Sequence, residues 1–387
     1  MLSPRSGSMV IENASIVTPE KVLEHASLKV TDGTIVAVSR DRLNGCDLRI
    51  DAEGMYVLPG LIDLHSDAIE KEIEPRTGAL FPLNMAIREM DKKLAACGIT
   101  TIYHSVAYTQ WHDGVRNNGF ASDIVREVNR LAPELGVRTK VHARFEISNA
   151  KIVPFLEPML REGQIHLLSI MDHTPGQGQY KNPRDVLKFI KGRDATDEEL
   201  TEYISRKQKE SVPLRTDYVR QLVEACRSRG IPVASHDDDT VEKLDIVEEM
   251  GITITEFPIN METVESAHKR NMHILLGAPN VVRGSSTGNN LNAREAIRAG
   301  YDEVLCSDYS PMSMVHAVFT LERTGILPLY KAVNMASLNP AKAVGISGYT
   351  GSIEPGKSAD LVIIDPDAEI PKVMKTFVEG KEVFSTW

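Results

Sequence analysis

The sequence predicts an α/β protein: a TIM-type (β/α)8 barrel with a small β-sandwich domain built from both chain ends. In the middle of the chain, eight short apolar runs alternate with segments of helical periodicity. Near-continuous apolar strands that alternate with helices indicate a parallel sheet, and eight such units favour a closed barrel. A doubly wound open sheet is the structural alternative. The GxGxxG and GxxxxGKS/T nucleotide-binding motifs are absent from the sequence.

The two ends of the chain consist of short strand-like runs that are separated by turn residues. Asp32-Gly33 is typical of a two-residue hairpin turn, and Glu379-Gly380 predicts a second hairpin near the C-terminus. The strand-like runs cover residues 10–17, 26–30, 34–38, 359–365, 372–378 and 381–384. Because neither end can bury a core alone, we expect residues 9–56 and 346–387 to form the sandwich and residues 57–345 to form the barrel.

The barrel elements follow the apolar pattern. The first strand is predicted within residues 55–67, and the others cover residues 99–106, 137–145, 165–171, 231–235, 252–257, 273–276 and 303–307. Helical periodicity is clearest in residues 85–97, 121–135, 216–229, 261–270 and 291–299. One connection, about residues 174–215, is polar and much longer than the others. It begins with a glycine-containing stretch directly after His173, so we expect a lid insertion there.

Composition narrows the class of function. The formal net charge is −10, with 44 Lys+Arg against 54 Asp+Glu, which argues against non-specific binding of nucleic acid or of anionic membranes. An anionic substrate remains compatible, because bound divalent ions and a few arginines can dominate a local field. The four cysteines are scattered without a CxxC pair, no apolar run reaches the ~18 residues of a membrane helix, and no signal pattern opens the chain. We therefore expect a cytoplasmic protein.

Histidines and acids recur where the predicted barrel strands end. His65 and Asp67 are two residues apart on the first strand and would project from the same face. The complete set of such residues is His65, Asp67, His104, His142, Arg144, Glu146, Asp172, His173, His236, Asp237, Asp238, Asp239, Glu256 and Asp308. Any one of them could simply cap a strand. Together they predict a metal site, because burying so many carboxylates is costly without cations.

The donor types indicate which ions would bind. Mixed imidazole and carboxylate ligands suit Zn²⁺, Mn²⁺ or Fe²⁺ rather than a thiolate centre. We expect one or two divalent ions, since one carboxylate between two ions would make a binuclear site. A water molecule with a lowered pKa would then be the nucleophile, and a further Asp could act as general base.

Several motifs resemble those of the metal-dependent amidohydrolase superfamily. They are the Leu-Pro-Gly-Leu-Ile-Asp-Leu-His stretch of residues 58–65, the Asp that closes the eighth strand, Asn339-Pro340-Ala341, and the segment 351–362. The resemblance covers nearly the whole chain from Met9. Within the superfamily, residues 169–177, 234–238, 256–258, 277–284 and 307–309 are most similar to a branch of the carbon–phosphorus lyase pathway. That branch releases pyrophosphate from α-D-ribose 1-methylphosphonate 5-triphosphate.

The resemblance implies a set of site residues. The implied metal ligands are His65, Asp67, Glu146, His173, His236 and Asp308, with Glu256 as a further candidate and Asp308 also as the catalytic base. Two positions depart from the superfamily, because His-x-Asp replaces its His-x-His and Glu256 replaces its strand-six His. Glu146 resembles the bridging Glu of the deacetylase branch. The candidate substrate contacts are Lys71, Arg76, Arg144, Asn280, Arg283 and Gly284, with His104 as a further candidate.

The resemblance thus predicts a hydrolase that converts the 5-triphosphate to the 5-phosphate plus pyrophosphate in phosphonate catabolism. Its partner would be a phosphorylated sugar, with no nucleic acid or membrane, and a homo-oligomer is compatible with this reading. One alternative is a metal-dependent C–N hydrolase of a cyclic amide or an N-acyl amino acid, whose pocket should carry one cation instead of several. A scaffold without metals is disfavoured, because every candidate ligand position holds a polar, metal-competent residue.

Overall fold

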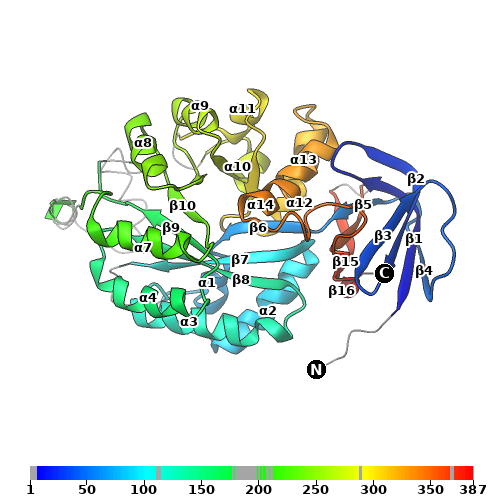
Figure 1. Ribbon diagram of the computed structural model, residues 1–387, viewed down its shortest axis with the longest axis horizontal. Coiled ribbons are helices and arrows are strands. Elements are labelled where there is room, and N and C mark those ends of the chain that lie inside the picture. Colours follow the sequence, from blue (N-terminus) through cyan, green and yellow to red (C-terminus); the bar gives the residue numbers. More distant parts are fainter. Residues whose placement is uncertain are drawn as a thin grey trace.

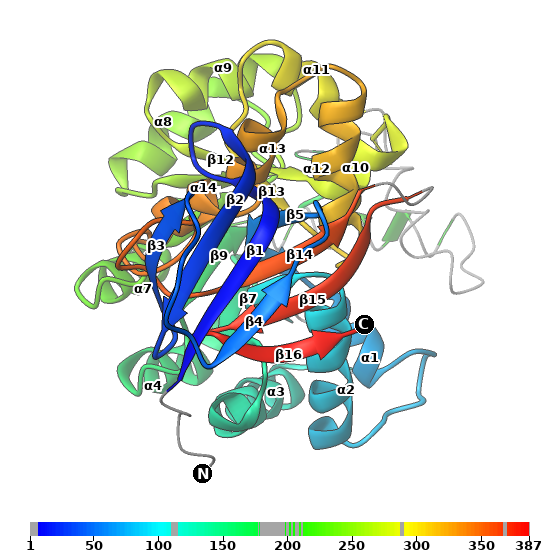
Figure 2. The same ribbon diagram turned by 90° about the vertical axis from the view of Figure 1, so that its right-hand side faces the viewer.

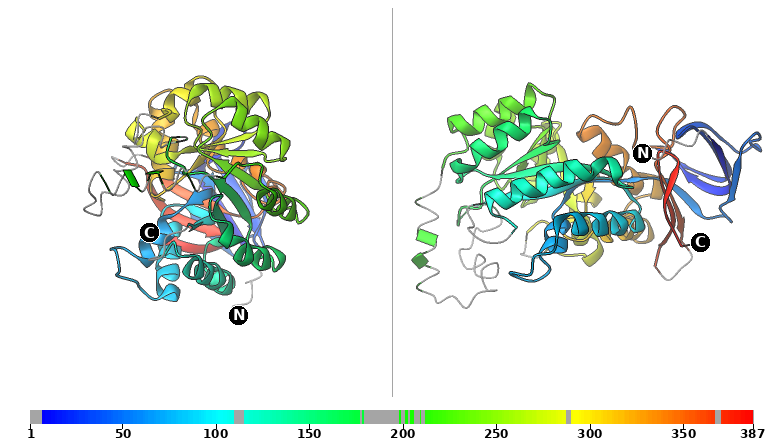
Figure 3. Two further views of the ribbon diagram at one scale, coloured as in Figure 1. Left: turned by 90° about the vertical axis from the view of Figure 1, so that its left-hand side faces the viewer. Right: turned by 90° about the horizontal axis from the view of Figure 1, so that it is seen from below.

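A computed structural model describes residues 7–109, 115–176, 212–286, 290–366 and 370–386, with a few single positions between 178 and 209. The described residues form two sheets, a parallel ring with helices around it and a separate sheet beside it (Figure 1). Seen from below, the two lie at opposite ends of an elongated molecule (Figure 3). Most of the expected lid insertion, about residues 174–215, lies outside the described residues.

The separate sheet contains strands from both ends of the chain (Figure 2). Its strands are β1 (Ser8–Val17), β2 (Val22–Thr31), β3 (Thr34–Ser39), β4 (Leu48–Asp51), β5 (Tyr56–Pro59), β14 (Leu361–Asp365), β15 (Lys372–Val378) and β16 (Lys381–Ser385). In place of a two-sheet sandwich, the structure has one hydrogen-bonded sheet in the order β16-β15-β14-β5-β1-β2-β3, with β4 paired to β1. The sheet has its own apolar core, which includes Ile11, Leu28, Val57, Leu361 and Phe377.

Both predicted hairpin turns are present. Asp32 and Gly33 join β2 to β3 with φ values of 49° and 76°, and Glu379 and Gly380 join β15 to β16 with φ values of 50° and 72°. Positive φ at both central residues matches the right-handed twist of the flanking strands. The two turns touch, since a Cβ on Gly33 would lie 2.6 Å from the carbonyl oxygen of Glu379. Only glycine fits there.

The barrel begins later than residue 57. Residues 56–59 form β5, which pairs with β1 and β14 of the separate sheet, and the first barrel strand starts at Leu61. Gly60 lies at the crossing, where a Cβ would come within 2.1 Å of the Thr100 hydroxyl oxygen. The apolar run reads through this crossing because both sheets bury it, and hydrophobicity alone therefore does not reveal the change of sheet.

Eight parallel strands form the ring, and each pairs with its sequence neighbour. They are β6 (Leu61–Ser66), β7 (Ile99–Tyr108), β8 (Arg138–Glu146), β9 (Leu167–Met171), β10 (Val233–His236), β11 (Ile254–Glu256), β12 (His273–Gly277) and β13 (Val304–Cys306). The ring is nearly closed: Ser66 and Asp308 form an isolated parallel bridge, and the Asp308 N–H donates to the His65 carbonyl at 2.9 Å. This closure favours the barrel over the open sheet.

Helices pack around the ring, and α14 (Leu338–Ala343) lies against the end of the ring where the strands begin. They are α1 (Ala68–Ile73), α2 (Leu83–Ala96), α3 (Asn118–Leu131), α4 (Val153–Arg161), α7 (Asp217–Arg227), α8 (Val241–Glu249), α9 (Met261–Lys269), α10 (Ala278–Arg283), α11 (Ala293–Arg298), α12 (Ser313–Arg323), α13 (Leu329–Met335) and α14 (Leu338–Ala343). In α3, Asn117 caps the first turn, and Ala121, Ile124, Val125 and Val128 are buried on one face. None of the helices in the described part of the chain is long and apolar enough to cross a membrane.

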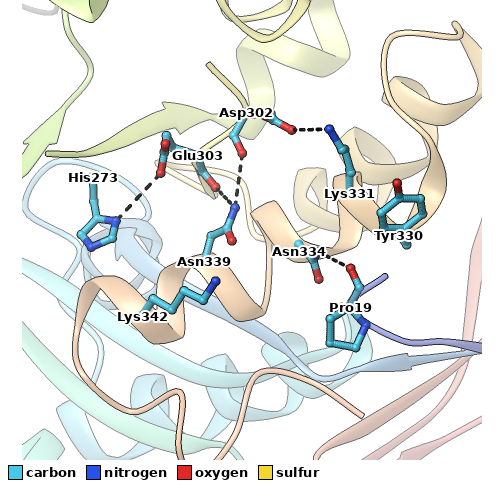
Figure 4. A pocket seen from close by; sticks show the side chains of 9 residues that line it. All are labelled: Pro19, His273, Asp302, Glu303, Tyr330, Lys331, Asn334, Asn339 and Lys342. Atoms are coloured by element: carbon cyan, nitrogen blue, oxygen red, sulfur yellow. Dashed lines mark hydrogen bonds and ion pairs between the residues drawn. The ribbon is translucent and has the colours of Figure 1, made fainter. Parts of the chain in front are cut away.

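A polar cavity of about 400 Å³ lies at the end of the barrel where the strands begin (Figure 4). His273 opens β12 and Glu303 directly precedes β13, and both side chains line the cavity together with Pro19 from the turn after β1. Asn339 closes one wall by donating to the Glu303 carbonyl. In barrels of this type, catalytic groups lie at the other end, where the strands finish.

Candidate active site

Histidine and carboxylate side chains converge at the C-terminal ends of the barrel strands. Two groups place their donor atoms within 4.8 Å of one another: His65, His236 and Glu256 in the first, and His173, His236 and Asp237 in the second. His236 belongs to both groups. Its ring centroid lies 5.5 Å from that of His65 and 5.8 Å from that of His173. The predicted convergence of strand ends therefore produces one continuous cluster.

The first group lies deep in the barrel. His65 Nδ1 is 3.0 Å from Glu256 Oε1, and both side chains are almost fully buried. His142 Nε2 approaches the same oxygen at 3.7 Å. Burial, together with the charge of nearby Arg144, holds the pKa of His65 well below its usual range, and burial lowers the pKa of His142 to about 3. Both imidazoles are therefore neutral, which is the form that ligates metals.

Several donor atoms in this group fit a divalent ion. Both carboxylate oxygens of Glu256, and Nδ1 of His65 and of His236, are buried and form no hydrogen bond of normal geometry among the described residues, although His65 Nδ1 lies 3.0 Å from Glu256 Oε1. A buried carboxylate whose nearest partners are neutral imidazoles is strongly destabilising, and a cation would relieve that cost. Mixed imidazole and carboxylate donors are also the set that Zn²⁺, Mn²⁺ or Fe²⁺ accepts. The residues present thus fit the kind of ion that the sequence predicted.

The second group is closer to the surface. Glu146, the last residue of β8, accepts from the His173 backbone N–H at 3.2 Å and lies 2.8 Å from His173 Nδ1. Asp237 Oδ2 lies 3.2 Å from His236 Nδ1 and 3.8 Å from His173 Nε2. Burial alone would raise the pKa of Asp237, but His236 and His173 outweigh it and the pKa is lowered. Asp237 is therefore an anionic donor between two imidazoles.

Two arginines contact one carboxylate at the edge of this cluster. Arg144 Nη1 and Arg116 Nη2 both lie 3.4 Å from Asp67 Oδ2. Arg144 is buried, and its Nη2 is also 3.1 Å from His236 Nε2. Arg116 donates through Nε to the buried Glu70 at 2.8 Å. Asp67 thus faces guanidinium groups, and its predicted role as a metal ligand stays a prediction.

Asp308 occupies the seam of the barrel. Its φ is 56°, and its carbonyl accepts from the Asp67 N–H at 2.9 Å. Burial, and then the negative charge of Asp67, raises the pKa of Asp308 to about 7. A carboxyl group with such a pKa can take a proton from water near neutral pH, as a general base must. This geometry suits the predicted catalytic role, and the roles of Asp308 as base and as ligand both stay predictions.

No hydrogen bond or ion pair among the described residues joins the remaining predicted substrate contacts to the cluster. Lys71, Arg76 and Arg283 are exposed. Asn280 donates to the Leu291 carbonyl and accepts from the Ala293 N–H, so its amide ties its own loop together. Gly284 ends α10 with a φ of 73°. Their roles toward a substrate stay predictions.

His104 is buried on β7, and its Nδ1 has no hydrogen-bond partner among the described residues. Burial lowers the pKa of His104 to about 4, which keeps the ring neutral. Its further role as a substrate contact also stays a prediction.

Some residues of the cluster received no role from the sequence. The sequence offers Asp237 only as one of three consecutive acids, and it does not single out Arg116 or Glu70. The positive φ of Asp237, 52°, turns it toward His236, and this conformation has no signal in the residue type. Arg116 comes several residues after β7, so a search restricted to strand ends passes over it. A search for arginines in the loops after each strand would have found it.

Comparison with known proteins agrees with this architecture. Residues 56–383 match the Amidohydrolase family. The chain is 32% identical to the α-D-ribose 1-methylphosphonate 5-triphosphate diphosphatase of Escherichia coli strain K12, over 97% of this chain and 100% of that protein. It is 23% identical to an imidazolonepropionase of Picrophilus torridus, over 93% of this chain and 92% of that protein.

Solved structures share the fold at lower identity. The N-acetylglucosamine-6-phosphate deacetylase of Pasteurella multocida matches with a TM-score of 0.66 at 14% identity, covering 97% of this chain and 99% of that one. Molinate hydrolase matches with a TM-score of 0.67 at 16% identity, covering 98% and 95%. The family match spans most of the chain, and the Escherichia coli relative aligns with nearly all of it. The chain therefore belongs to the amidohydrolase family.

Proposed function

We propose that the protein is a metal-dependent diphosphatase that hydrolyses α-D-ribose 1-methylphosphonate 5-triphosphate to the 5-phosphate and pyrophosphate, as a cytoplasmic enzyme of phosphonate catabolism. The relative from Escherichia coli, whose name describes this activity, supports the choice because the alignment runs along both chains in full or nearly so. The observation that carries the proposal is the pair of arginines at Asp67. A triphosphate requires several cations, and guanidinium groups bind phosphate oxygens bidentately.

Some side chains of the cluster would bind metal ions, and others would take part in the reaction. His65, His236, Glu256, His173 and Asp237 would hold one or two divalent ions. When bound, such ions supply Lewis-acid chemistry, in that they lower the pKa of water and polarise a phosphoryl oxygen. Glu146 orients the His173 ring through its 2.8 Å contact with Nδ1. The buried position of the first group would keep bulk water away from these charges.

The reaction itself is a single displacement at phosphorus. Asp308 takes a proton from a water molecule whose oxygen attacks the phosphorus nearest the ribose. The bond between that phosphorus and the bridging oxygen breaks, and pyrophosphate leaves. Arg144 and Arg116 offset the charge that develops on the phosphoryl oxygens, a role that is mainly electrostatic in phosphoryl transfer.

Hydrolysis in ¹⁸O-labelled water tests the proposal directly. The metal-loaded protein is incubated with the triphosphate, the products are separated, and their masses are measured by mass spectrometry. We expect equimolar pyrophosphate and 5-phosphate, with the label in the 5-phosphate because attack occurs at the phosphorus nearest the ribose. Release of orthophosphate, or label in pyrophosphate, would contradict the proposed reaction.

Variants of Arg144, which contacts both Asp67 and His236, sharpen this test. Arg144→Met should lower kcat/KM for the triphosphate by roughly 10²-fold, because a charge-assisted contact to phosphate is lost. Arg144→Lys should recover part of the activity. Arg126→Met is the matched control, because Arg126 pairs with Asp123 on the exposed face of α3. Activity that is equal in all three variants would remove the support that the arginine pair lends.

A second candidate function is hydrolysis of a C–N bond in a cyclic amide or an N-acyl amino acid. Relatives named as imidazolonepropionase and dihydroorotase, at 21–24% identity, favour it. The same protein preparation should be assayed with 4-imidazolone-5-propanoate, dihydroorotate and an N-acetylated amino acid. Turnover of any of these with a higher kcat/KM than the triphosphate would select this function instead.

A further inference from the structure

A partly buried lysine contacts the turn that carries two residues of the cluster. Lys243 is the third residue of α8, and its side chain is 19% exposed. Its Nζ lies 2.8 Å from the His236 carbonyl, 3.3 Å from the Asp237 carbonyl and 3.1 Å from Asp238 Oδ1. An ammonium group has three N–H donors, and here three oxygens of one turn surround it. The lysine therefore contacts three consecutive residues, from His236 at the end of β10 to Asp238.

The partner carboxylate connects this turn to the next strand. Asp238 is fully buried, and its Oδ2 accepts from the hydroxyl groups of Ser235 on β10 and Thr255 on β11. Its backbone carbonyl accepts from the Ile259 N–H at 2.9 Å. Thr255 directly precedes Glu256, which belongs to the first group of candidate ligands. The Lys243–Asp238 ion pair is thus linked to β10 and β11, two adjacent strands that both carry candidate ligands.

The turn has a left-handed backbone at Asp237. The φ of Asp237 is 52°, a conformation that residues other than glycine adopt less readily, although aspartate tolerates it better than most. This conformation brings the Asp237 carboxylate to His236 and His173. The contacts from Lys243 to the two flanking carbonyls orient the peptide groups on either side of Asp237. Without them, the backbone of Asp237 is free to relax.

We propose that Lys243 and Asp238 are positioning residues for the metal centre: they hold the His236–Asp237 turn in the geometry that binds a divalent ion. Neither residue is needed to contact the ion or the substrate. The inference concerns metal affinity and is independent of which bond the enzyme hydrolyses. It extends to this chain the general rule that groups behind the ligands set their orientation.

Metal titration of variants tests this inference without any substrate. Metal-free protein is titrated with Zn²⁺ against a chromogenic chelator at low temperature, and circular dichroism verifies that each variant is folded. Lys243→Met should weaken Zn²⁺ binding by roughly 10- to 100-fold, and Asp238→Asn should weaken it in the same direction. Lys243→Arg retains the charge and should restore part of the affinity. Lys92→Met, which breaks the exposed pair with Glu89 on α2, is the matched control and should leave the affinity within about twofold of the wild type.

A purely structural role predicts a different outcome. In that case Lys243→Met would lower the thermal midpoint, but the folded variant would bind Zn²⁺ within about threefold as tightly as the wild type, which would overturn the inference. If Lys243→Met fails to fold, Asp238→Asn decides by the same criterion, because its amide oxygen can still accept from Ser235 and Thr255. A wild type that binds no divalent ion would also overturn it. Since no triphosphate is involved, failure here leaves the proposed reaction to be judged by its own experiment.

Discussion

Replacing Arg138 should lower the free energy of unfolding, because this residue connects the separate sheet to the barrel. It opens β8 and donates to Asp360, which directly precedes β14, through Nη1 at 2.9 Å and Nη2 at 3.4 Å. It also donates to Thr101 on β7 and to Glu379 in the last hairpin turn. The same strand ends in the Arg144 and Glu146 region of the cluster. A single guanidinium group thus joins the separate sheet to a strand that carries the site.

The magnitude follows from the burial of the partner. The Asp360 side chain is only 1% exposed, so Arg138→Met leaves a buried carboxylate without its cation. Breaking a buried pair in this way costs about 3–5 kcal/mol. Asp360 keeps two hydroxyl donors, Thr350 and Ser358, and the Glu379 N–H, so we expect the lower end of that range, about 3 kcal/mol. The half-exposed Glu379 side chain adds at most about 1 kcal/mol.

Urea unfolding followed by circular dichroism measures this loss. A double-mutant cycle with Arg138→Met and Asp360→Asn isolates the coupling between the two residues, which should be about 1.5–3 kcal/mol. Arg88→Met is the control, because Arg88 and its partner Glu134 are both about half exposed, and it should cost less than about 1 kcal/mol. A coupling energy below about 0.5 kcal/mol would refute the reasoning, since independent sites add within that margin.

Three further predictions concern pH, catalysis and substrate charge. Burial, together with Lys140, lowers the pKa of His166 to about 4 from 6.5, so the unfolded chain binds more protons between those values and stability should fall as pH drops through this window. Urea unfolding at pH 7 and at pH 4.5 measures this fall in the free energy of unfolding, and His166→Gln should abolish up to about 3 kcal/mol of it. The control His25→Asn, at an exposed position, should not. Equal pH dependence in both variants would contradict the assignment. Asp308→Asn should lower kcat by roughly 10²-fold with metal content unchanged by elemental analysis, and equivalent loss of metal would make Asp308 chiefly a ligand. Arg283→Ala should reduce kcat/KM for the triphosphate by a factor that corresponds to a loss of at least about 2 kcal/mol of transition-state stabilisation, and Arg283→Lys should recover part of it. Intact turnover would exclude Arg283 from phosphate binding.

Local patterns in the sequence carry much of the fold. The alternation of apolar runs and helical segments predicts the eight barrel strands, because burial on both faces of a parallel strand demands continuous hydrophobicity. The Asp32-Gly33 and Glu379-Gly380 turns are predicted for the same kind of reason, since only residues that tolerate positive φ fit such hairpins. The recurrence of histidines and acids at strand ends predicts where the cluster lies, because strand ends in a barrel all meet at one rim.

Tertiary structure alone decides which of those side chains meet. Hydrophobicity does not distinguish β5 from the barrel strand that follows it, because each sheet buries its share of one apolar run. The two arginines at Asp67 come from different loops and strands, and Arg138 and Asp360 are 222 residues apart in the chain. The left-handed turn at Asp237, with Lys243 beneath it, likewise depends on contacts across α8 and β11. Periodicity in a sequence indicates which face of an element is buried. The residue that packs against that face depends on strand register and on closure of the ring, and both exist only once the chain has folded.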